Sequence, residues 1–182
     1  MKRFLLASCC AALASCASSA GPVKTYDLGL DAPKSALPAL RSVSVRAAMP
    51  FDGIDMYYRL AWRDGAEIAP FAQSRWAAPP ADLLRKQVLR ALPSSSAAPC
   101  ALELEMQDFS QVFSAKESSE ARLELRALLG TTAGRVASRS VLVSEANAGV
   151  NAASGAAALS RAVGRAIAEL GGWIAAQPGC KG

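Results

Sequence analysis

The chain has 182 residues, with 20 basic and 15 acidic side chains, a formal net charge of +5 at pH 7 and no histidine. The absence of histidine removes the most frequent general base, the Ser–His and Cys–His nucleophile pairs and the commonest zinc ligand. Basic and acidic residues are interspersed along the sequence, which argues against a nucleic-acid-binding surface. The length suits one folded domain.

The first residues have the pattern of a secretory signal peptide. Lys2 and Arg3 form a short cationic start, and residues 4–13 are apolar apart from Ser8. About ten apolar residues are well short of the ~20 that a membrane-spanning helix needs, so we predict a cleaved signal. Loss of the two basic residues with this signal lowers the net charge of the mature chain from +5 to +3.

The signal ends in Leu-Ala-Ser-Cys at residues 13–16, which resembles the bacterial lipobox. In lipobox proteins the cysteine is acylated and becomes the mature N-terminus. We therefore predict a signal peptide over residues 1–15 and attachment of lipid (diacylglycerol and an amide-linked acyl chain such as palmitate) at Cys16. Several acyl chains give stable anchoring, whereas one chain anchors only marginally. An ordinary signal with cleavage after Ala20 is the alternative.

The residue after the cysteine bears on localisation. In Gram-negative lipoproteins an aspartate at this position commonly retains the protein at the inner membrane, and this chain has Ala17 instead. We therefore expect a lipid anchor in the outer membrane, with the folded domain at its periplasmic face.

A tether and three strands are predicted next. Residues 16–24 are small, polar and interrupted by Gly and Pro, so we interpret them as a lipidated flexible tether. Alternation of apolar and polar side chains predicts strands over residues 26–30, 40–47 and 54–62.

Two segments have the period of amphipathic helices. Pro80 suits the first turn of a helix over about 80–92, in which apolar residues recur every fourth position from Leu84 to Leu92. Residues 153–175 carry apolar side chains at i, i+3, i+4 and i+7 over four turns, with arginines off that stripe. We predict a second helix there, packed on the core.

The remaining strands complete the expected fold. Residues 101–129 alternate between apolar and polar side chains on either side of a polar loop, Lys116–Glu120, and predict an antiparallel hairpin; a further strand follows at about 135–144. The pattern predicts an α+β fold with one domain over residues 25–177, followed by a C-terminal tail over 178–182. Its sheet would be mostly antiparallel, with about five to six strands packed by the two helices.

The cysteines suggest one disulfide. Cys9 and Cys10 leave with the signal and Cys16 is expected to be acylated, so Cys100 and Cys180 remain. In an oxidising periplasm two such thiols are most simply joined. Two separately buried thiols are the alternative. Because no Cys-x-x-Cys spacing is present, we expect a stabilising bridge without redox chemistry and no cysteine metal site.

No catalytic arrangement is visible in the sequence. Asp108 stands beside Phe109 in a strand-like segment, but no readable spacing places a second carboxylate with it, so we predict a hydrogen-bonding role at a kink or bulge. The serines at 94–96 have no nucleophile-elbow pattern, and Gly130-Thr131-Thr132 lacks the lysine of a phosphate-binding loop. We predict that the chain is not an enzyme and needs no metal or cofactor.

Arg75 and Trp76 are candidate partner-binding residues. They stand just before Pro79 and Pro80, where a rigid loop could project, and Arg and Trp are enriched at binding hot spots. The alternative is that Trp76 fills the core beneath the start of the first helix.

Several short motifs stand in the order seen in ABC-type transport auxiliary lipoproteins, the Pqi-type family, which this chain resembles over residues 25–176. The motifs are Tyr26-Asp27-Leu28-Gly29, Tyr57-Tyr58-Arg59, Ser74-Arg75-Trp76-Ala77-Ala78-Pro79-Pro80 with Leu83-Leu84, Asp108-Phe109-Ser110-Gln111-Val112-Phe113, and Gly149-Val150 before an alanine-rich helix that closes on Trp173. The chain departs from the family at Val141-Leu142-Val143, where the strand before the final helix usually has an aromatic residue.

The resemblance implies an outer-membrane lipoprotein that works with an MCE-domain protein, a permease and the ATPase of an ABC transporter. Such systems move phospholipid or other hydrophobic molecules across the envelope. The chain would dock or receive the periplasmic end of the MCE assembly, and it could form a homo-oligomer, because family members form rings.

Two other functions are weighed against this one. An independent periplasmic lipid-binding or envelope-stabilising lipoprotein would need no ATPase, and a lipid carrier would need an apolar pocket. A periplasmic enzyme is the least supported, because the sequence has no histidine and no visible carboxylate pair or metal cluster.

Overall fold

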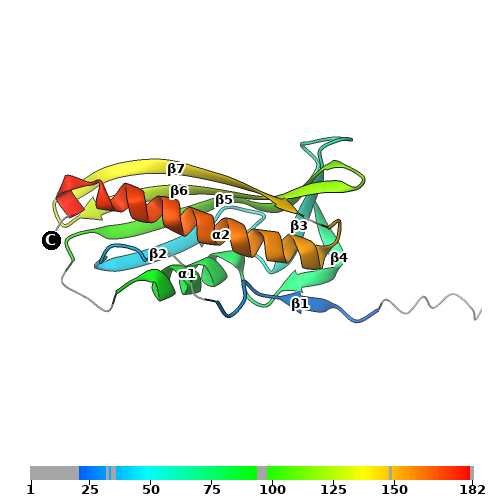
Figure 1. Ribbon diagram of the computed structural model, residues 1–182, viewed down its shortest axis with the longest axis horizontal. Coiled ribbons are helices and arrows are strands. Elements are labelled where there is room, and N and C mark those ends of the chain that lie inside the picture. Colours follow the sequence, from blue (N-terminus) through cyan, green and yellow to red (C-terminus); the bar gives the residue numbers. More distant parts are fainter. Residues whose placement is uncertain (1–20, 32, 34–35, 94–97, 148, 181–182) are drawn as a thin grey trace, which may run out of the picture.

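The computed structural model describes residues 21–31, 33, 36–93, 98–147 and 149–180. Within them the chain forms an α+β domain of one seven-stranded mixed sheet and two helices (Figure 1). The predicted signal peptide, the lipid attachment site Cys16 and the tether up to residue 20 lie outside the described residues.

The elements follow one another as β1 (Lys24–Tyr26), β2 (Ser42–Ala47), β3 (Asp55–Leu60), β4 (Ala69–Trp76), α1 (Pro80–Ala91), β5 (Ala101–Ala115), β6 (Ser118–Thr131), β7 (Gly134–Asn147), α2 (Ala152–Ala175) and a short 3-10 helix, η1 (Pro178–Cys180). The strand order is β1-β4-β3-β5-β6-β7, and β2 also pairs with β5. The long β5–β6 and β6–β7 pairs are antiparallel, as is β3–β4. Three shorter pairs, β1–β4, β2–β5 and β3–β5, are parallel.

Two strands share one edge of β5. β2 pairs with its first half, up to Met106, and β3 pairs with its second half, from Ser110. A register shift against β6 lies between Met106 and Asp108, where the change from β2 to β3 takes place. A β-bulge bends a strand and increases its local twist, which lets one long strand serve two partners.

Both predicted helices are confirmed to within one residue at each end. α1 has proline at its start, and Leu92 after it takes an extended conformation, as expected for a residue that precedes proline. α2 begins with a capping box, in which the side chains of Asn151 and Ser154 each accept a hydrogen bond from the other's backbone N–H. α2 lies across β5, β6 and β7, and α1 packs against β2 (Figure 1).

The expected α+β class is confirmed, and three local predictions need correction. The first strand covers Lys24–Tyr26 and not 26–30, because Asp27 accepts a hydrogen bond from Gly29 N–H at 2.8 Å and Gly29 has a φ of +84°, which turns the chain. The loop predicted at Lys116–Glu120 is shorter, since β6 already starts at Ser118. β4 was not predicted as a strand, and with it the sheet reaches seven strands.

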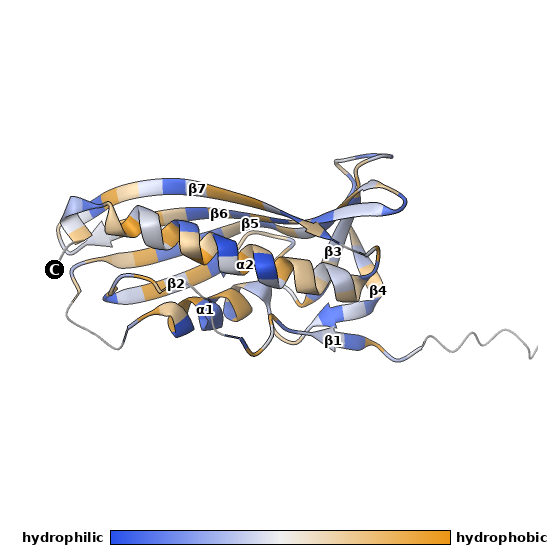
Figure 2. Ribbon diagram, in the orientation of Figure 1, coloured by the Kyte–Doolittle hydropathy of each residue, from blue (hydrophilic) through white to orange (hydrophobic). Residues whose placement is uncertain are grey.

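The core lies between the helices and one face of the sheet (Figure 2). Alternate side chains of β6 from Ala121 to Leu129 are fully buried, while the residues between them face away from the helices. Ala158, Ala162 and Ala166 form much of the buried face of α2, and such small side chains let a helix approach a sheet closely. Among the described residues, no helix combines the length and the apolar character needed to cross a membrane.

Candidate functional site

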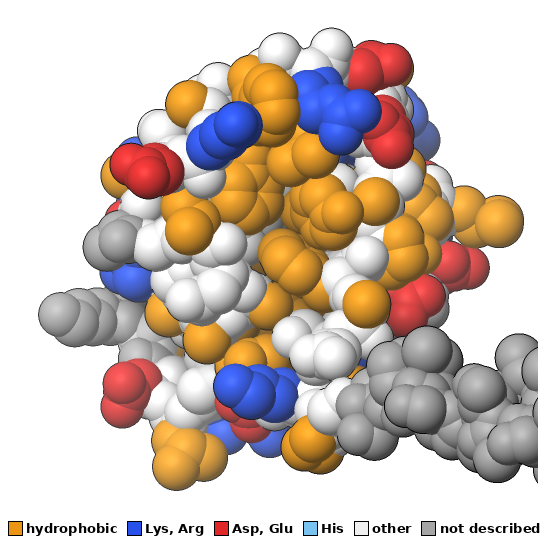
Figure 3. All heavy atoms as spheres, turned by 90° about the vertical axis from the view of Figure 1, so that its right-hand side faces the viewer, with side chains coloured by type: hydrophobic (Ala, Val, Ile, Leu, Met, Phe, Trp, Pro, Cys, Tyr) orange, Lys and Arg blue, Asp and Glu red, His pale blue; other side chains and the backbone are white. Residues whose placement is uncertain are grey.

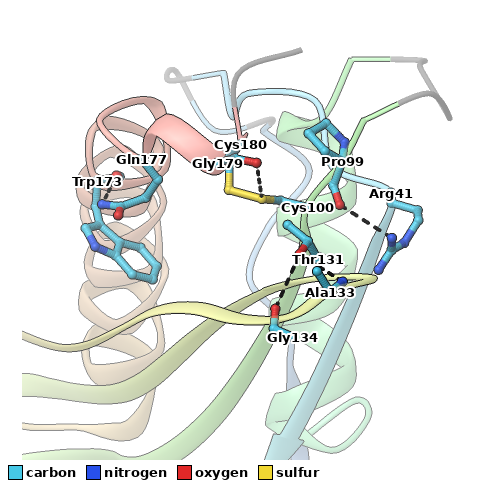
Figure 4. The surroundings of a disulfide bond; sticks show 10 residues. All are labelled: Arg41, Pro99, Cys100, Thr131, Ala133, Gly134, Trp173, Gln177, Gly179 and Cys180. Carbon is cyan, nitrogen blue, oxygen red and sulfur yellow. Dashed lines mark hydrogen bonds between the residues drawn. A yellow bond between two sulfur atoms is a disulfide. The ribbon is translucent and has the colours of Figure 1, made fainter.

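The structure contains the predicted Cys100–Cys180 disulfide (Figure 4). It joins η1, after the end of α2, to the residue before β5, and the two Cα atoms are 5.3 Å apart. Both cysteines are buried, and the backbone N–H of Arg41 donates to Cys100 O at 2.7 Å. The bridge therefore pins the C-terminal segment to the start of the interior strand β5, which is a structural role.

The structure separates the two candidate partner-binding residues. Trp76 is only 1% exposed, and its ring lies 5.2 Å from that of Phe109 in the core. This burial agrees with the alternative in which Trp76 fills the core beneath the start of the first helix, and it leaves almost no surface of Trp76 for a partner. Arg75 is exposed on β4, opposite Asp55 of β3, and stays available as a candidate.

Asp108 lies at the bulge, as predicted. Its side chain is 10% exposed and accepts from Ser110 Oγ at 2.5 Å and from Arg59 Nη2 at 3.3 Å. Arg122 lies on the other side, with Nε at 3.6 Å from the same carboxylate. Two arginines and a hydroxyl thus surround the Asp108 carboxylate. These contacts stabilise the register shift of β5 at this residue.

A second carboxylate, Glu124 of β6, lies opposite Asp108 in the sheet, which the spacing in the sequence did not indicate. Glu124 pairs with Arg122 at 2.9 Å, so Arg122 is shared between the two carboxylates. The described part of the chain also contains no group of three or more His, Cys, Asp or Glu side chains that could bind a metal. The contacts of Asp108 join β3, β5 and β6 through ion pairs and a hydrogen bond.

A groove of about 390 Å³ lies between α1, α2 and the segment after β1, and we call it the helix groove. Its residues are Leu28, Asp31, Pro33, Gln87, Ser160, Arg161, Val163, Gly164, Arg165 and Ala168. Ser160 Oγ donates to Leu28 O at 2.6 Å, which holds the segment after β1 against α2. A Cβ atom on Gly164 would meet no atom of the described residues within 4 Å, so the groove is open at that point.

Gln87 is the polar group at the base of this groove. It is 4% exposed, and its Nε2 donates to Gly29 O at 3.3 Å, whereas its Oε1 is buried without a hydrogen-bond partner among the described residues. A buried acceptor of this kind can bind a ligand that donates a hydrogen bond. The burial of Gln87 could have been predicted from the sequence, because Gln87 falls on the apolar side of the predicted helix, between Leu84 and Val88.

Two arginines at the mouth of the groove already have a partner. Arg165 Nη1 and Arg161 Nε contact the two carboxylate oxygens of Glu145 on β7, at 2.7 and 3.2 Å. The hydrogen bond from Arg165 holds the pKa of Glu145 below its usual range, against the opposite effect of burial. An anionic headgroup would have to compete with this carboxylate, so the groove favours an apolar or neutral ligand.

Within the described part of the chain no helix covers the second face of the sheet, which is largely polar. Arg46 of β2 pairs with Glu105 of β5 at 2.9 Å, and a shallow depression of about 280 Å³ runs from these strands to Arg126 and Leu128 of β6. Leu142 of β7 is an exposed apolar residue on this face. The face offers charged side chains of both signs to another protein.

Comparison of sequences found no match, either among family models or among curated proteins. Comparison of structures found proteins of similar fold, among them two crystal structures. Protein XCC0632 from Xanthomonas campestris, of the DUF330 family, has a TM-score of 0.70 and 22% sequence identity, with 83% of this chain and 94% of that chain covered. The chain has a DUF330-like fold.

The second match is to an uncharacterized protein. It has a TM-score of 0.66 and 12% identity, and the alignment covers 84% of this chain and 99% of the other. At such identities the similarity establishes the fold. DUF330 is the ABC-type transport auxiliary lipoprotein family, so the fold agrees with the resemblance seen in the sequence motifs.

Proposed function

We propose that this protein is an outer-membrane-anchored lipoprotein component of an ABC/MCE-type lipid transport system. The observation that carries the proposal is the DUF330-like fold over 83% of the chain; the signal-peptide pattern and the lipobox-like Leu-Ala-Ser-Cys predicted from residues 1–16 support it. Cys16 carries the lipid, and the domain remains at the periplasmic face of the outer membrane. There it docks or receives the periplasmic end of an MCE-domain protein, whose permease and ATPase are separate chains.

A docking role fits the chemistry of the domain. The ion pairs and buried polar groups described above hold strands together. We propose that the domain binds a protein partner and does not catalyse a reaction. The exposed Arg75 and the uncovered face of the sheet, with Arg46, Glu105 and Leu142, offer surfaces to a protein partner. A homo-oligomer would multiply these contacts around one MCE assembly.

Co-purification from membranes at native expression tests this proposal. The lipoprotein should be recovered with an MCE-domain protein after mild detergent extraction, and Arg75→Ala and Leu142→Asp should weaken recovery if these surfaces dock. Leu89→Asp, at an exposed apolar position of α1, is a matched control that should leave it unchanged. Repeated recovery without any MCE-domain protein would count against the proposal.

The helix groove supports a second candidate function, an independent periplasmic lipid-binding lipoprotein. The groove joins apolar side chains to one buried acceptor, Gln87 Oε1, which is the general character of small-molecule sites. Gly164→Leu would project into the groove, whereas Gly172→Leu, on the same helix outside it, is the control, since a Cβ there also meets nothing within 4 Å among the described residues. Mass spectrometry should find a co-purified lipid that Gly164→Leu removes and Gly172→Leu retains; no bound lipid in the unaltered protein would exclude this function.

A further inference from the structure

The described chain enters the domain at one end of the sheet. β1 is parallel to β4, with Lys24 opposite Ser74 and Tyr26 opposite Trp76, so the residues before Lys24 run toward the start of β4. Gly21 accordingly lies beside the Gln73 side chain, where an added Cβ would be 3.8 Å from Nε2. Figure 1 shows this entry at the right-hand end, away from the C-terminus and the disulfide.

The sheet extends beyond the helix at this same end. α2 starts at Ala152, and its first turns pack on Gln111 of β5 through Gly155. Phe113 lies two residues farther along β5 on the same face, and its neighbour on β3 is Leu60. Phe113 is itself only 7% exposed, whereas Leu60 beside it is half-buried, so part of the apolar surface beyond the start of α2 remains accessible.

An aromatic cluster occupies this part of the sheet. The ring of Tyr58 lies 4.8 Å from that of Phe71 and 6.1 Å from that of Phe113. Tyr58, Leu60 and Phe71 are half-buried, and the neighbouring segments add Trp62, 44% exposed, and Val150, 46% exposed. We call this surface the apolar end; its accessible residues are Tyr58, Leu60, Trp62, Phe71 and Val150, and the buried Phe113 packs against Tyr58.

The charges around the apolar end nearly cancel. Its two projecting connections, from β3 to β4 and from β5 to β6, carry Arg63 and Lys116 against the acidic side chains of Asp64, Glu67 and Glu117. Figure 3 shows this end, with apolar side chains gathered in the middle and both signs of charge around them. Such a surface has no strong electrostatic preference for anionic lipid and can associate with a bilayer through apolar contact.

We propose that the apolar end rests on the bilayer in which Cys16 is anchored, with Trp62 in the interfacial region. This inference depends on the proposed lipidation. Five residues take the chain from Cys16 to Gly21, a span of at most about 17 Å, so the anchor keeps this end close to the lipid. Tryptophan is the side chain that favours the membrane interface, and tethering makes even a weak contact effective.

This orientation assigns different tasks to the two ends of the domain. The end with the Cys100–Cys180 bridge and Trp173, drawn in Figure 4, points away from the membrane into the periplasm. The apolar end can receive or pass a hydrophobic molecule at the membrane surface.

Quenching of tryptophan fluorescence by brominated lipid tests the contact. The full mature lipoprotein, extracted from bacterial membranes, is reconstituted into phosphatidylcholine vesicles with and without bromine on the acyl chains. We expect the brominated vesicles to remove part of the emission, at low and at high salt alike. Trp62→Phe should abolish this loss, whereas Trp173→Phe, at the opposite end, should leave it in place.

The possible results separate the two proposals. Protein that floats with the vesicles but shows no quenching is anchored, yet its apolar end faces something else, which overturns the membrane contact. Cross-linking of that end to a second copy or to another protein would then identify the occupant. Protein that does not float with the vesicles lacks a functional anchor, and this result overturns both the lipidation and the contact that rests on it.

Discussion

Gly155 of α2 packs directly on the side chain of Gln111 of β5, so closely that a Cβ atom on residue 155 would overlap with Gln111 Oε1. Gln111 is buried and donates through Nε2 to Ser119 Oγ at 2.8 Å. Ser119 Oγ in turn donates to Gly149 O at 3.0 Å, just before the helix. The start of α2 is thus fixed on the sheet by one glycine and a short chain of buried hydrogen bonds.

Gly155→Ala should destabilise the domain by about 1–2 kcal/mol, because the added methyl would overlap Gln111 Oε1 and Cδ, and displacing this buried side chain would strain its hydrogen bond to Ser119. The matched control is Gly164→Ala in the same helix, where the added methyl meets no described atom within 4 Å. That change should stabilise the domain by about 0.5–1 kcal/mol through helix propensity. Urea unfolding followed by circular dichroism measures both, and equal effects of the two substitutions would contradict the close packing.

Removing the disulfide should lower stability without altering the fold. The bridge joins residues separated by 80 positions, for which the chain-entropy model gives roughly 4 kcal/mol, usually less in practice. Cys100→Ser together with Cys180→Ser should therefore shift the urea midpoint downward, and a reducing agent should shift only the unsubstituted protein. Two free thiols in the denatured, unreduced mature protein would show that the bridge does not form.

Asp108→Ala should cost about 2 kcal/mol or more, because it leaves Arg59 and Arg122 partly buried without their shared carboxylate. Glu105→Ala is the comparison, since its partner Arg46 is 71% exposed and such a pair is worth at most about 1 kcal/mol. Chemical denaturation measures the loss of unfolding free energy in each variant, and a larger loss for Asp108→Ala would show that the Asp108 carboxylate supports the fold. Similar losses for both would argue against the role assigned to Asp108.

The Glu145 cluster should make stability depend on pH in acid. Arg165 and, more weakly, Arg161 lower the pKa of Glu145 in the folded protein, so its contribution is fully present above the pKa of the unfolded state. That contribution is lost as the pH falls through the folded pKa. In urea titrations from neutral pH to about pH 3, Glu145→Gln should remove this part of the acid dependence. An unchanged acid profile would mean that the pair does not persist in solution.

The sequence predicted the elements whose periodicity is strong. The apolar stripe of α2 and the alternation along β5 and β6 each extend over many residues, so both helices were found to within one residue and the hairpin was found with a loop that was too long. β4 was missed because Ala-Pro-Phe-Ala-Gln-Ser-Arg-Trp has no regular alternation and contains Pro70. Its strand character comes from pairing with β3 and β1, which single-sequence periodicity does not show.

The candidate surfaces were harder to predict than the fold. The disulfide and the bulge at Asp108 followed from composition and from an isolated carboxylate in an apolar strand. The helix groove and the apolar end depend on how α2 is placed over the sheet. The burial of Trp76 depends on its packing against Phe109 of a different strand. Each joins residues far apart in the chain, so no local pattern indicates them.

Acylation of Cys16 is the claim on which the membrane anchor, the transport role and the membrane contact all depend. Intact-mass spectrometry of the protein recovered from fractionated outer membranes tests it most directly. The mature chain should begin at Cys16 and carry the added mass of a diacylglycerol and an amide-linked acyl chain, and Cys16→Ser should abolish that mass. A mature chain that begins at Gly21 without acyl groups, recovered in the soluble periplasmic fraction, would contradict the account.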